Sequence, residues 1–428
     1  MSYQAVILSK TFYEPSFSTI FLLQISIFIY FSCTSEFFIV TLHRFFYIQT
    51  MSVEIRQAND RKTMNDFIAF PRKLYKGSKE YIPDLDSDVR DFFDAKKNDS
   101  LRYARIQPFV AYRNGECVGR VAALISNRAN TKWDRKSVRF TYLDFIDDYE
   151  VSSELLETVE RWGQKQGMKV CEGPLGITDF DKEGMLIEDF HLGGGTMEFW
   201  NYPYYVEHMR RAGYDKAVDW LQVRVKVPKE VPAKYARVAA LSKEMFGLRV
   251  VKATKKMVMK EGWGQRLFHL FNEAFAPLYG TSVFSNDQID DYLRQYVPLL
   301  DLELVPFIVN EKDEIVGAAV TIRDLSPALN KSGGRLLPFG WYHLGKALLM
   351  KKGDKAQLML IAVRPDMQGL GLNALIFNDL IPIYNRVGIK WCETNPQLET
   401  NVKELSQWKP LNPEMVKRRR CWQKEMKG

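Results

Sequence analysis

The chain has 428 residues, of which 46% are hydrophobic and 26% are charged, and its formal net charge is +8. This composition is typical of a folded globular chain and excludes a largely disordered protein, while the length favours two or three domains. The modest positive charge is compatible with a polyanionic ligand, but it argues against a nucleic-acid-binding protein.

Cysteine and histidine give little sign of special chemistry. The five cysteines are odd in number, scattered and free of any Cys-x-x-Cys pair, which indicates reduced thiols and a cytoplasmic protein. The five histidines form no pair at positions i and i+4, so we predict no metal site.

The first fifty residues differ in composition from the rest of the chain. They contain no Gly and no Asp, 13 of them are aromatic, and residues 15–35 are uncharged over a length that could span a bilayer. Two interpretations remain open for residues 1–50. They form a membrane anchor, or the start is misassigned and translation begins at Met51, which we favour because a globular composition starts there.

Residues 51–228 contain the elements of a first domain. A short strand at 53–56 is followed by an apolar hairpin at 109–122, a central strand at 142–146 and an amphipathic helix at 152–164. Asp147, Asp148 and Glu150 lie between the central strand and this helix, where they would repel an anion. We therefore expect no phosphate site in this part of the chain.

Residues 229–428 repeat this pattern. The segment 248–251 corresponds to 53–56, the hairpin 305–320 to 109–122, and the segment 388–393 to 167–172. Matches in the same order indicate an internal repeat. Trp341-Tyr342-His343 lies in an insertion between the hairpin and the next strand, where it could cover a cleft.

The second copy differs from the first at its central strand. The apolar run ending at Val363 passes through Gln368-Gly369-Leu370-Gly371 into a helix predicted over 369–386. The first N–H groups of a helix lack partners and lie at the positive end of its dipole. Glycines let the backbone approach a phosphate closely, so this turn is a predicted anion site.

This turn resembles the acyl-CoA loop of the GNAT superfamily of N-acyltransferases, which has the pattern Gln/Arg-x-x-Gly-x-Gly/Ala after a strand. Gln368, Gly371 and Asn373 occupy its three fixed positions, although Asn stands where Gly or Ala is usual. The order of segments from residue 248 onward also resembles this family. The resemblance implies an α+β fold with two tandem GNAT-like domains, 51–228 and 229–428, each a twisted, mixed, mostly antiparallel sheet flanked by helices. Only the second is expected to bind a cofactor.

The resemblance implies acetyl-CoA or another acyl-CoA as co-substrate. The pyrophosphate would lie on the backbone N–H groups of the turn, and the pantetheine would add to the edge of the preceding strand. The cofactor-binding residues expected on this basis are Ile361, Ala362, Val363, Gln368, Gly369, Leu370, Gly371, Leu372, Asn373 and Asn401.

Catalysis would require a base for the attacking amine and an acid for the leaving thiolate. The family usually places a Tyr seven residues after the Asn of the last helix, but counting from Asn401 leads to Trp408. Tyr384 and Cys392 are the alternative acids, or the thiolate leaves unassisted. Glu393 is the candidate base, although a strand-end carboxylate paired with a lysine is an equally good interpretation.

We therefore expect a cytoplasmic N-acyltransferase that transfers an acetyl or acyl group from CoA to an amine of a small molecule or peptide. A non-catalytic acyl-CoA-binding or scaffold protein is the alternative, and transfer from an aminoacyl-tRNA is a third possibility with little support. No nucleic-acid partner is expected, a homodimer is a possible assembly, and membrane contact is expected only if residues 1–50 are genuine.

Overall fold

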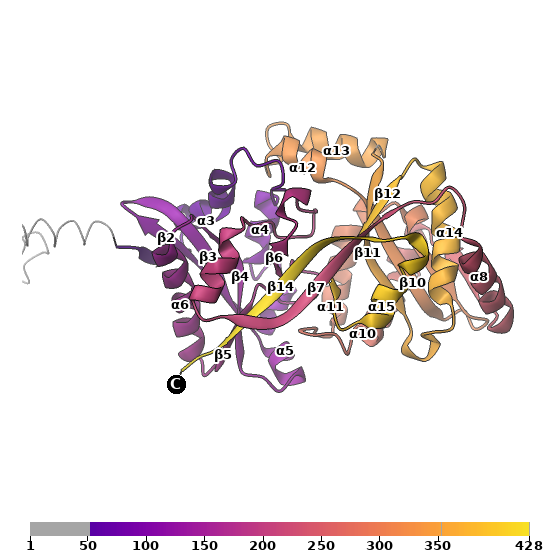
Figure 1. Ribbon diagram of the computed structural model, residues 1–428, viewed down its shortest axis with the longest axis horizontal. Helices are drawn as coiled ribbons and strands as arrows, with labels where there is room; N and C mark the ends of the chain where they lie inside the picture. Colours follow the sequence, from indigo (N-terminus) through magenta and orange to yellow (C-terminus); the bar gives the residue numbers. More distant parts are fainter. Residues whose placement is uncertain (1–51, 352, 428) are drawn as a thin grey trace, which may run out of the picture. The chain divides into compact units, whose positions relative to one another are not determined.

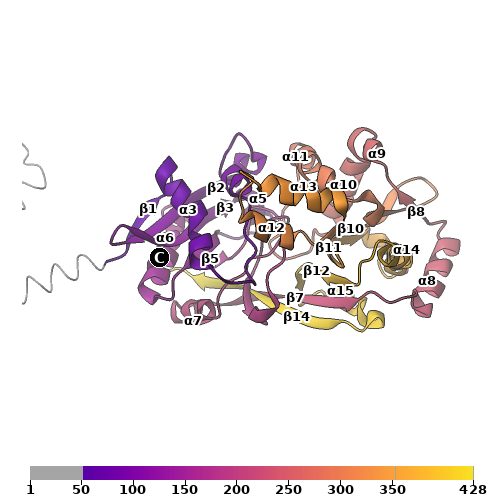
Figure 2. The same cartoon turned by 90° about the horizontal axis from the view of Figure 1, so that it is seen from above.

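The computed structural model describes residues 52–351 and 353–427. Residues 53–112 and 116–427 belong to one compact unit. Its strands form one mixed, mostly antiparallel sheet, and helices pack on the faces of this sheet (Figures 1 and 2). The predicted mixed-sheet fold is confirmed. The two interpretations of residues 1–50 lie outside the described residues.

The first half of the sequence contains the strands β1–β7 and the helices α3–α7. The strands are β1 Glu54–Gln57, β2 Ala104–Arg113, β3 Glu116–Ser126, β4 Ser137–Phe145, β5 Val170–Gly173, β6 Met185–Glu188 and β7 Asp215–Lys226. The helices are α3 Arg61–Leu74, α4 Asp86–Phe92, α5 Asn127–Lys132, α6 Tyr149–Gln164 and α7 Tyr204–Arg211, with short 3-10 turns η2 Asp99–Arg102 and η3 Phe190–Leu192.

The second half contains β8–β14 and α8–α15. The strands are β8 Arg249–Lys252, β9 Pro306–Val309, β10 Ile315–Arg323, β11 Lys355–Val363, β12 Trp391–Thr394, β13 Gln397–Leu398 and β14 Glu414–Glu425. The helices are α8 Ala233–Met245, α9 Lys255–Lys260, α10 Trp263–Ala274, α11 Asn286–Tyr296, α12 Ser326–Ser332, α13 Gly340–Met350, α14 Leu372–Arg386 and α15 Val402–Ser406. The 3-10 turns are η4 Val297–Leu299, η5 Leu302–Leu304, η6 Pro365–Met367 and η7 Lys409–Leu411.

The two halves share one strand pattern. The order β1-β2-β3-β4-β5 in the first half corresponds to β8-β9-β10-β11-β12 in the second. In both, the third and fourth strands are antiparallel and the fourth and fifth are parallel. The predicted hairpin and the internal repeat are therefore present in the structure.

The last strands are exchanged between the halves. Next to β5 of the first half lies β14, the last strand of the chain, whose residues 422–425 pair with β5. Next to β12 of the second half lies β7, through Arg224–Lys226. β7 and β14 pair with each other along most of their length and cross the middle of Figure 1 as two long adjacent ribbons. Each half thus completes its sheet with a strand from the other, and the boundary at 228/229 stays a prediction.

Alternating side chains place a core on each face of the second half. Ile308 packs in one cluster with residues of α8 and α14, whereas its neighbours Phe307 and Val309 pack in another with residues of α10 and α11. This is the two-residue period of a strand that is buried on both sides. The helices α14 and α10 therefore cover opposite faces of this part of the sheet.

Candidate active site

The turn after β11 is the first component of the site. The helix α14 begins at Leu372 rather than at the predicted Gly369, because Gly369 and Gly371 have φ angles of 83° and 86°. These angles lie in the left-handed region, which a helix cannot include and which glycine adopts without strain. The turn is therefore a loop that leads into the helix, with Gly371 as its N-cap.

Several amides of this loop are unpaired. Within the described residues, the N–H groups of Gly369, Gly371, Leu372 and Asn373 donate to no protein acceptor. Three residues of the loop (Gln368, Gly369 and Gly371) and the first two residues of α14 (Leu372 and Asn373) line a large cavity. Unpaired amides at the positive end of a helix, beside two positions without a Cβ, fit a phosphate or diphosphate group.

The loop is held against α8 by close packing. The hydroxyl of Ser242 donates to the carbonyl of Leu370 over 2.6 Å. A Cβ atom on Gly371 would overlap Ser242 and Val238, whereas one on Gly369 would meet no atom within 4 Å. Gly371 therefore allows the loop to approach α8, and Gly369 lies in open space.

The sheet separates beside this loop. The parallel register of β11 with β12 covers only Lys355 to Leu358, and the last backbone bond runs from Asn395 N–H to the Leu358 carbonyl over 3.0 Å. Residues 360–363 of β11 stay paired with β10 on one side, and no strand among the described residues pairs with them on the other. This open edge contains Ile361, Ala362 and Val363, all of which line the cavity.

The cavity has a volume of about 1650 Å³, and most of its lining is apolar. Its wall includes residues from both faces of β11, since Ile361 packs with the α14 cluster and Ala362 with the α10 cluster. The opening between β11 and β12 therefore joins the two faces of the sheet. Aromatic and aliphatic lining residues include Phe180, Phe268, Phe271, Phe307, Leu348 and Met359.

Three carboxylates lie on another part of the wall. Asp179, Asp181 and Glu183 come from the loop between β5 and β6, and all three line the cavity. Asp181 is fixed in place, because its Oδ2 accepts the N–H groups of Ile177 and Thr178 over 2.7 and 2.9 Å. The Oδ1 atom of Asp179 has no hydrogen-bond partner among the described residues.

Burial sets the protonation of these carboxylates. It raises the pKa of Asp179 to about 7, although Arg139 and Lys132 oppose the shift. It also raises the pKa of Asp181 to about 6 and that of Glu183 further. Between these acids, Phe180 packs in the same cluster as Met359 and Leu360. The acidic segment therefore lies beside the strand whose edge is open.

A fourth carboxylate lies on α15. Asn401 caps this helix by accepting the N–H of Glu404 over 3.3 Å, and both residues line the cavity. Burial raises the pKa of Glu404 to about 8, so the group is protonated at neutral pH. Trp408 is buried and donates from Nε1 to Gln397, so it packs where the family usually has a Tyr.

The structure does not bring the three predicted catalytic residues to the cavity, because none of them is part of its lining. The Tyr384 hydroxyl lies in the core under α14 and bonds Thr321 over 2.7 Å, and burial raises the pKa of Cys392 to about 12. Glu393 pairs with Lys417 over 2.5 Å and with Arg224 over 3.1 Å. This is the ion-paired alternative that the sequence left open.

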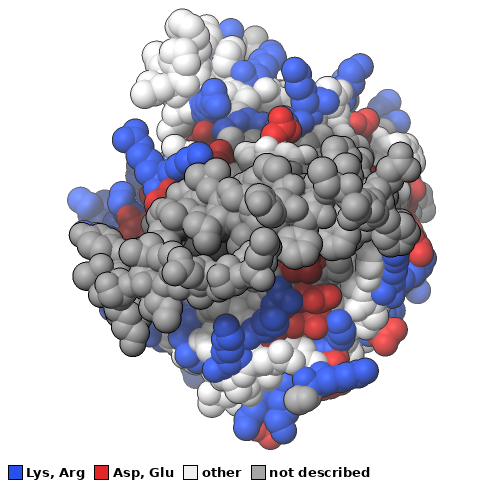
Figure 3. Space-filling view, turned by 90° about the vertical axis from the view of Figure 1, so that its left-hand side faces the viewer, with Lys and Arg blue, Asp and Glu red and all other residues white. Residues whose placement is uncertain are grey.

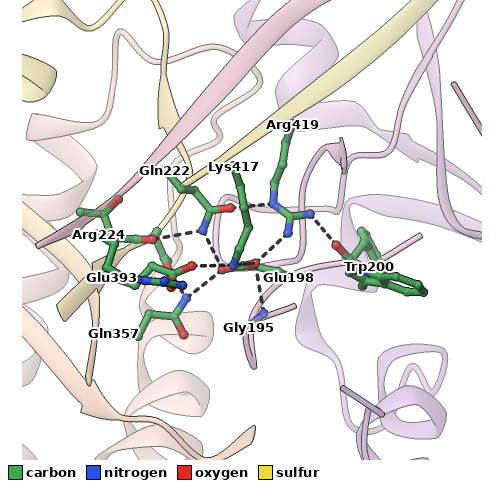
Figure 4. Close-up of polar contacts among 12 residues, drawn as sticks. Gly195, Glu198, Trp200, Gln222, Arg224, Gln357, Glu393, Lys417 and Arg419 are labelled. Atoms are coloured by element: carbon green, nitrogen blue, oxygen red, sulfur yellow. Dashed lines mark hydrogen bonds and ion pairs between the residues drawn. The ribbon is translucent and has the colours of Figure 1, made fainter. Parts of the chain in front are cut away.

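Glu393 belongs to a buried ionic network at the junction of the two halves (Figure 4). Its centre is Glu198, whose Oε2 lies 3.0 Å from Lys417 Nζ and 2.7 Å from Arg419 Nη2. Gln222 also donates to Glu198, and Gln357 of β11 bonds Asn395 where β11 and β12 separate. The network joins β14, β7, β11 and β12, so it fixes the base of the opening.

The start of α6 in the first half differs from the start of α14. At this corresponding position after β4, the Asp148 side chain accepts the N–H groups of Glu150 and Val151. A carboxylate therefore already caps the amides that a phosphate would need there.

The sequence analysis missed the acidic residues of the cavity. Asp179 and Glu404 are far apart in the chain and share no recognisable spacing. The signals available were the glycines at 176 and 184 around the acidic segment and the position of Glu404 three residues after Asn401. Neither signal assigns chemistry without the fold.

No protein-family model matches the chain. Among curated proteins, it is 26% identical over 385 residues to protein YghO of Escherichia coli K12, covering 87% of this chain and 95% of that protein. It is 25% identical over 304 residues to the bacterial ceramide synthase of Caulobacter vibrioides, covering 71% of this chain and 78% of that protein.

Solved structures with the same fold are GNAT proteins. A tandem GNAT protein from the clavulanic acid biosynthesis pathway aligns with a TM-score of 0.51 and 13% identity, covering 88% of this chain and 99% of that one. A GCN5-related glucosamine N-acetyltransferase region of a fungal β-N-acetylglucosaminidase aligns with a TM-score of 0.54 and 12% identity, covering 87% of this chain and 38% of that one. The chain therefore has the tandem GNAT fold that its sequence resembles.

Proposed function

We propose that this chain, which has the fold of tandem GNAT proteins, is an N-acyltransferase that moves a long-chain acyl group from CoA to an amine on an apolar molecule. The observation that carries the proposal is the set of unpaired amides after β11, which open into a large apolar cavity beside buried carboxylates. The similarity to a protein named bacterial ceramide synthase supports acyl and amine substrates with long chains.

The donor side would use the backbone of β11 and α14. The N–H groups from Gly369 to Asn373 would bind the pyrophosphate, and the open edge at Ile361, Ala362 and Val363 would align the pantetheine as an added strand. The thioester would then lie at the opening between β11 and β12. Acyl transfer there would benefit chiefly from proximity and orientation.

The acceptor side would use the acidic segment. An amine is protonated at neutral pH, and the ionised carboxylates of Asp181 and Asp179 would attract it as a cation within an apolar wall. Asp179 would then remove a proton, because its carboxylate has a pKa of about 7 and a free oxygen. The neutral nitrogen would attack the thioester carbon.

Glu404 would protonate the leaving thiolate, since it is protonated at neutral pH and lines the same cavity as the donor loop. The N–C amide bond forms as the C–S bond breaks. The ammonium group loses two protons in all, one of which ends on the thiol and the other in solvent. Glu404 would thereby take the role that Trp408 cannot perform.

The test is thiol release from acyl-CoAs of increasing chain length, with amines that differ in apolar length. We expect palmitoyl-CoA with a long-chain amino alcohol to react faster than acetyl-CoA with a small amine such as ethanolamine. Turnover that prefers the short substrates would contradict the long-chain assignment. Absence of turnover with every pair would contradict the enzyme itself.

A non-catalytic acyl-CoA-binding protein is the second candidate function. Trp408 in place of the usual Tyr and Asn373 in place of the usual Gly or Ala favour it. Calorimetric binding of an acyl-CoA without thiol release in the presence of the amines would support this alternative.

A further inference from the structure

The insertion between β10 and β11 carries unusual surface chemistry. It contains α12 and α13, which lie along the top of Figure 1. From Leu325 to Gly353 the sequence has no Asp and no Glu, but it has Lys331, Arg335, Lys346, Lys351 and Lys352. The insertion is therefore strongly basic, whereas acidic and basic residues are nearly balanced in the chain as a whole.

Large apolar side chains of the same insertion are exposed. Leu337, Phe339, Trp341 and Leu349 have 76%, 70%, 59% and 85% of their surface accessible, and the only buried residue of α13 is Gly340. At the top of Figure 3, which is the level of α12 and α13 in Figure 1, uncharged side chains project with Lys and Arg side chains around them. Contiguous apolar exposure of this kind marks an interaction site.

The other side of α13 belongs to the cavity. Leu344, Ala347 and Leu348 line it, and Trp341 and Leu349 contribute to both the lining and the exposed surface. One short helix therefore connects the apolar interior of the cavity with the apolar exterior of the insertion.

We propose that α12, α13 and the loop between them form a docking surface for an anionic lipid bilayer, through which apolar molecules enter the cavity. Leu337, Phe339, Trp341 and Leu349 would insert among the acyl chains near the headgroups. The flanking Lys and Arg residues would contact anionic headgroups. The segment itself has no carboxylate, and among the described residues Lys331 and Lys346 form no ion pair, whereas Arg335 and Lys351 pair with Asp86 and Asp301.

The helix would lie on the membrane and not cross it. α13 has eleven residues, and none of the described helices combines the length and apolarity that a membrane-spanning segment requires. Interfacial binding needs only an apolar surface with basic residues at its margin. This inference goes beyond the proposed acyl transfer and does not depend on it, because its readout is binding.

The experiment is flotation of the full chain with phosphatidylcholine vesicles that contain or lack phosphatidylglycerol. We expect binding to the anionic vesicles that weakens as salt rises. A variant with Leu337→Ser, Phe339→Ser, Trp341→Ser and Leu349→Ser should bind at least about tenfold more weakly. A second variant, with Lys331→Gln, Arg335→Gln and Lys346→Gln, should lose the preference for anionic vesicles.

The matched control carries Met245→Ser, Val283→Ser and Met415→Ser, which change equally exposed apolar side chains elsewhere. It should bind like the original chain, and all variants should keep the same melting transition. Unchanged binding of the variant with four serine substitutions would overturn the proposal, and this is the result expected if residues 1–50 anchor the chain instead. Failure of the original chain to bind anionic vesicles would also overturn it. So would a chain that binds no vesicles but forms a dimer which this variant loses.

Discussion

Glu198 and Lys417 form an ion pair in which both side chains are almost fully buried, with 3.0 Å between Oε2 and Nζ. Glu198 lies before α7 in the first half, and Lys417 lies on β14 at the end of the second. Arg419 contacts the same carboxylate, so one buried anion holds two cations (Figure 4). Attraction over such distances offsets desolvation only while every partner is present.

Glu198→Gln should therefore destabilise the fold by about 3–5 kcal/mol, because it leaves Lys417 and Arg419 uncompensated. Equilibrium urea unfolding at neutral pH measures this loss. Glu188→Gln is the matched control, since Glu188 pairs with Arg418 of the same strand at the surface, where such pairs contribute about 0–1 kcal/mol. Equal losses in the two variants would contradict the role of the buried pair.

The pH dependence of stability should also differ in Glu198→Gln. Burial alone would raise the pKa of Glu198, but Lys417 and Arg419 outweigh it and lower the pKa to about 2. The pKa of this carboxyl group is 4.5 in the unfolded chain and about 2 in the folded protein. The ionised group therefore stabilises the fold above pH 4.5, and this contribution is lost as the pH falls from 4.5 towards 2. The original chain should lose stability over this range more steeply than the variant.

Asn373→Glu should weaken acyl-CoA binding at least about tenfold, because a carboxylate in the first turn of α14 would repel the pyrophosphate. The same charge lies favourably at a helix N-terminus, so thermal stability should stay equal or rise slightly. Isothermal titration calorimetry with CoA checks the first effect and melting the second. Asn373→Gln, which adds length without charge, is the control, and a similar affinity for both variants would contradict the anion site.

Asp179→Asn should reduce kcat by about 10²–10⁴-fold while leaving the KM for the acyl-CoA unchanged, if Asp179 is the base. The rate of the original enzyme should rise with pH through about 7, where Asp179 loses its proton, and the variant should lack this rise. Asp134→Asn is the control, because Asp134 is exposed and Asn tolerates its positive φ. A pH profile unchanged by Asp179→Asn would exclude this role.

Glu404→Gln should remove the decline in kcat that we expect above about pH 8, where the proposed acid loses its proton. The substitution should also stabilise the fold at neutral pH. The pKa of Glu404 is 4.5 in the unfolded chain and about 8 in the folded protein. Because the folded state favours the protonated form, stability from this group is greatest below pH 4.5 and falls progressively as the pH rises towards 8. Kinetics and urea unfolding between pH 5 and pH 9 measure both effects, and Glu425→Gln on the end of β14 serves as the control.

Gly371→Ala should destabilise the fold more than Gly369→Ala, by at least about 1 kcal/mol. Both residues have a positive φ, which costs other residues about 1–2 kcal/mol. Only at Gly371 would the added Cβ overlap Ser242 and Val238 of α8. Melting temperatures of the two variants make the comparison directly.

Local signals in the sequence predicted the loop that we propose as the binding site for the acyl donor. The apolar run of β11, the glycines and the amphipathic start of α14 are contiguous, so their order alone indicates a strand, a turn and a helix. The proposed acceptor side could be recognised only in the fold, because Phe180, next to Asp179, packs with Met359 and Leu360 of β11 from the other half of the chain. Neighbouring positions on a strand face opposite ways, so Cys392 enters the core while Glu393 reaches Lys417.

The exchange of β7 and β14 has a consequence for how the protein is made. The sheet of the first half stays incomplete until residues 414–425 have been synthesised, so its edge at β5 is exposed throughout translation of the second half. Neither half expressed alone would hold its own closing strand. The two sheets can therefore close only in the complete polypeptide, once β14 has been synthesised.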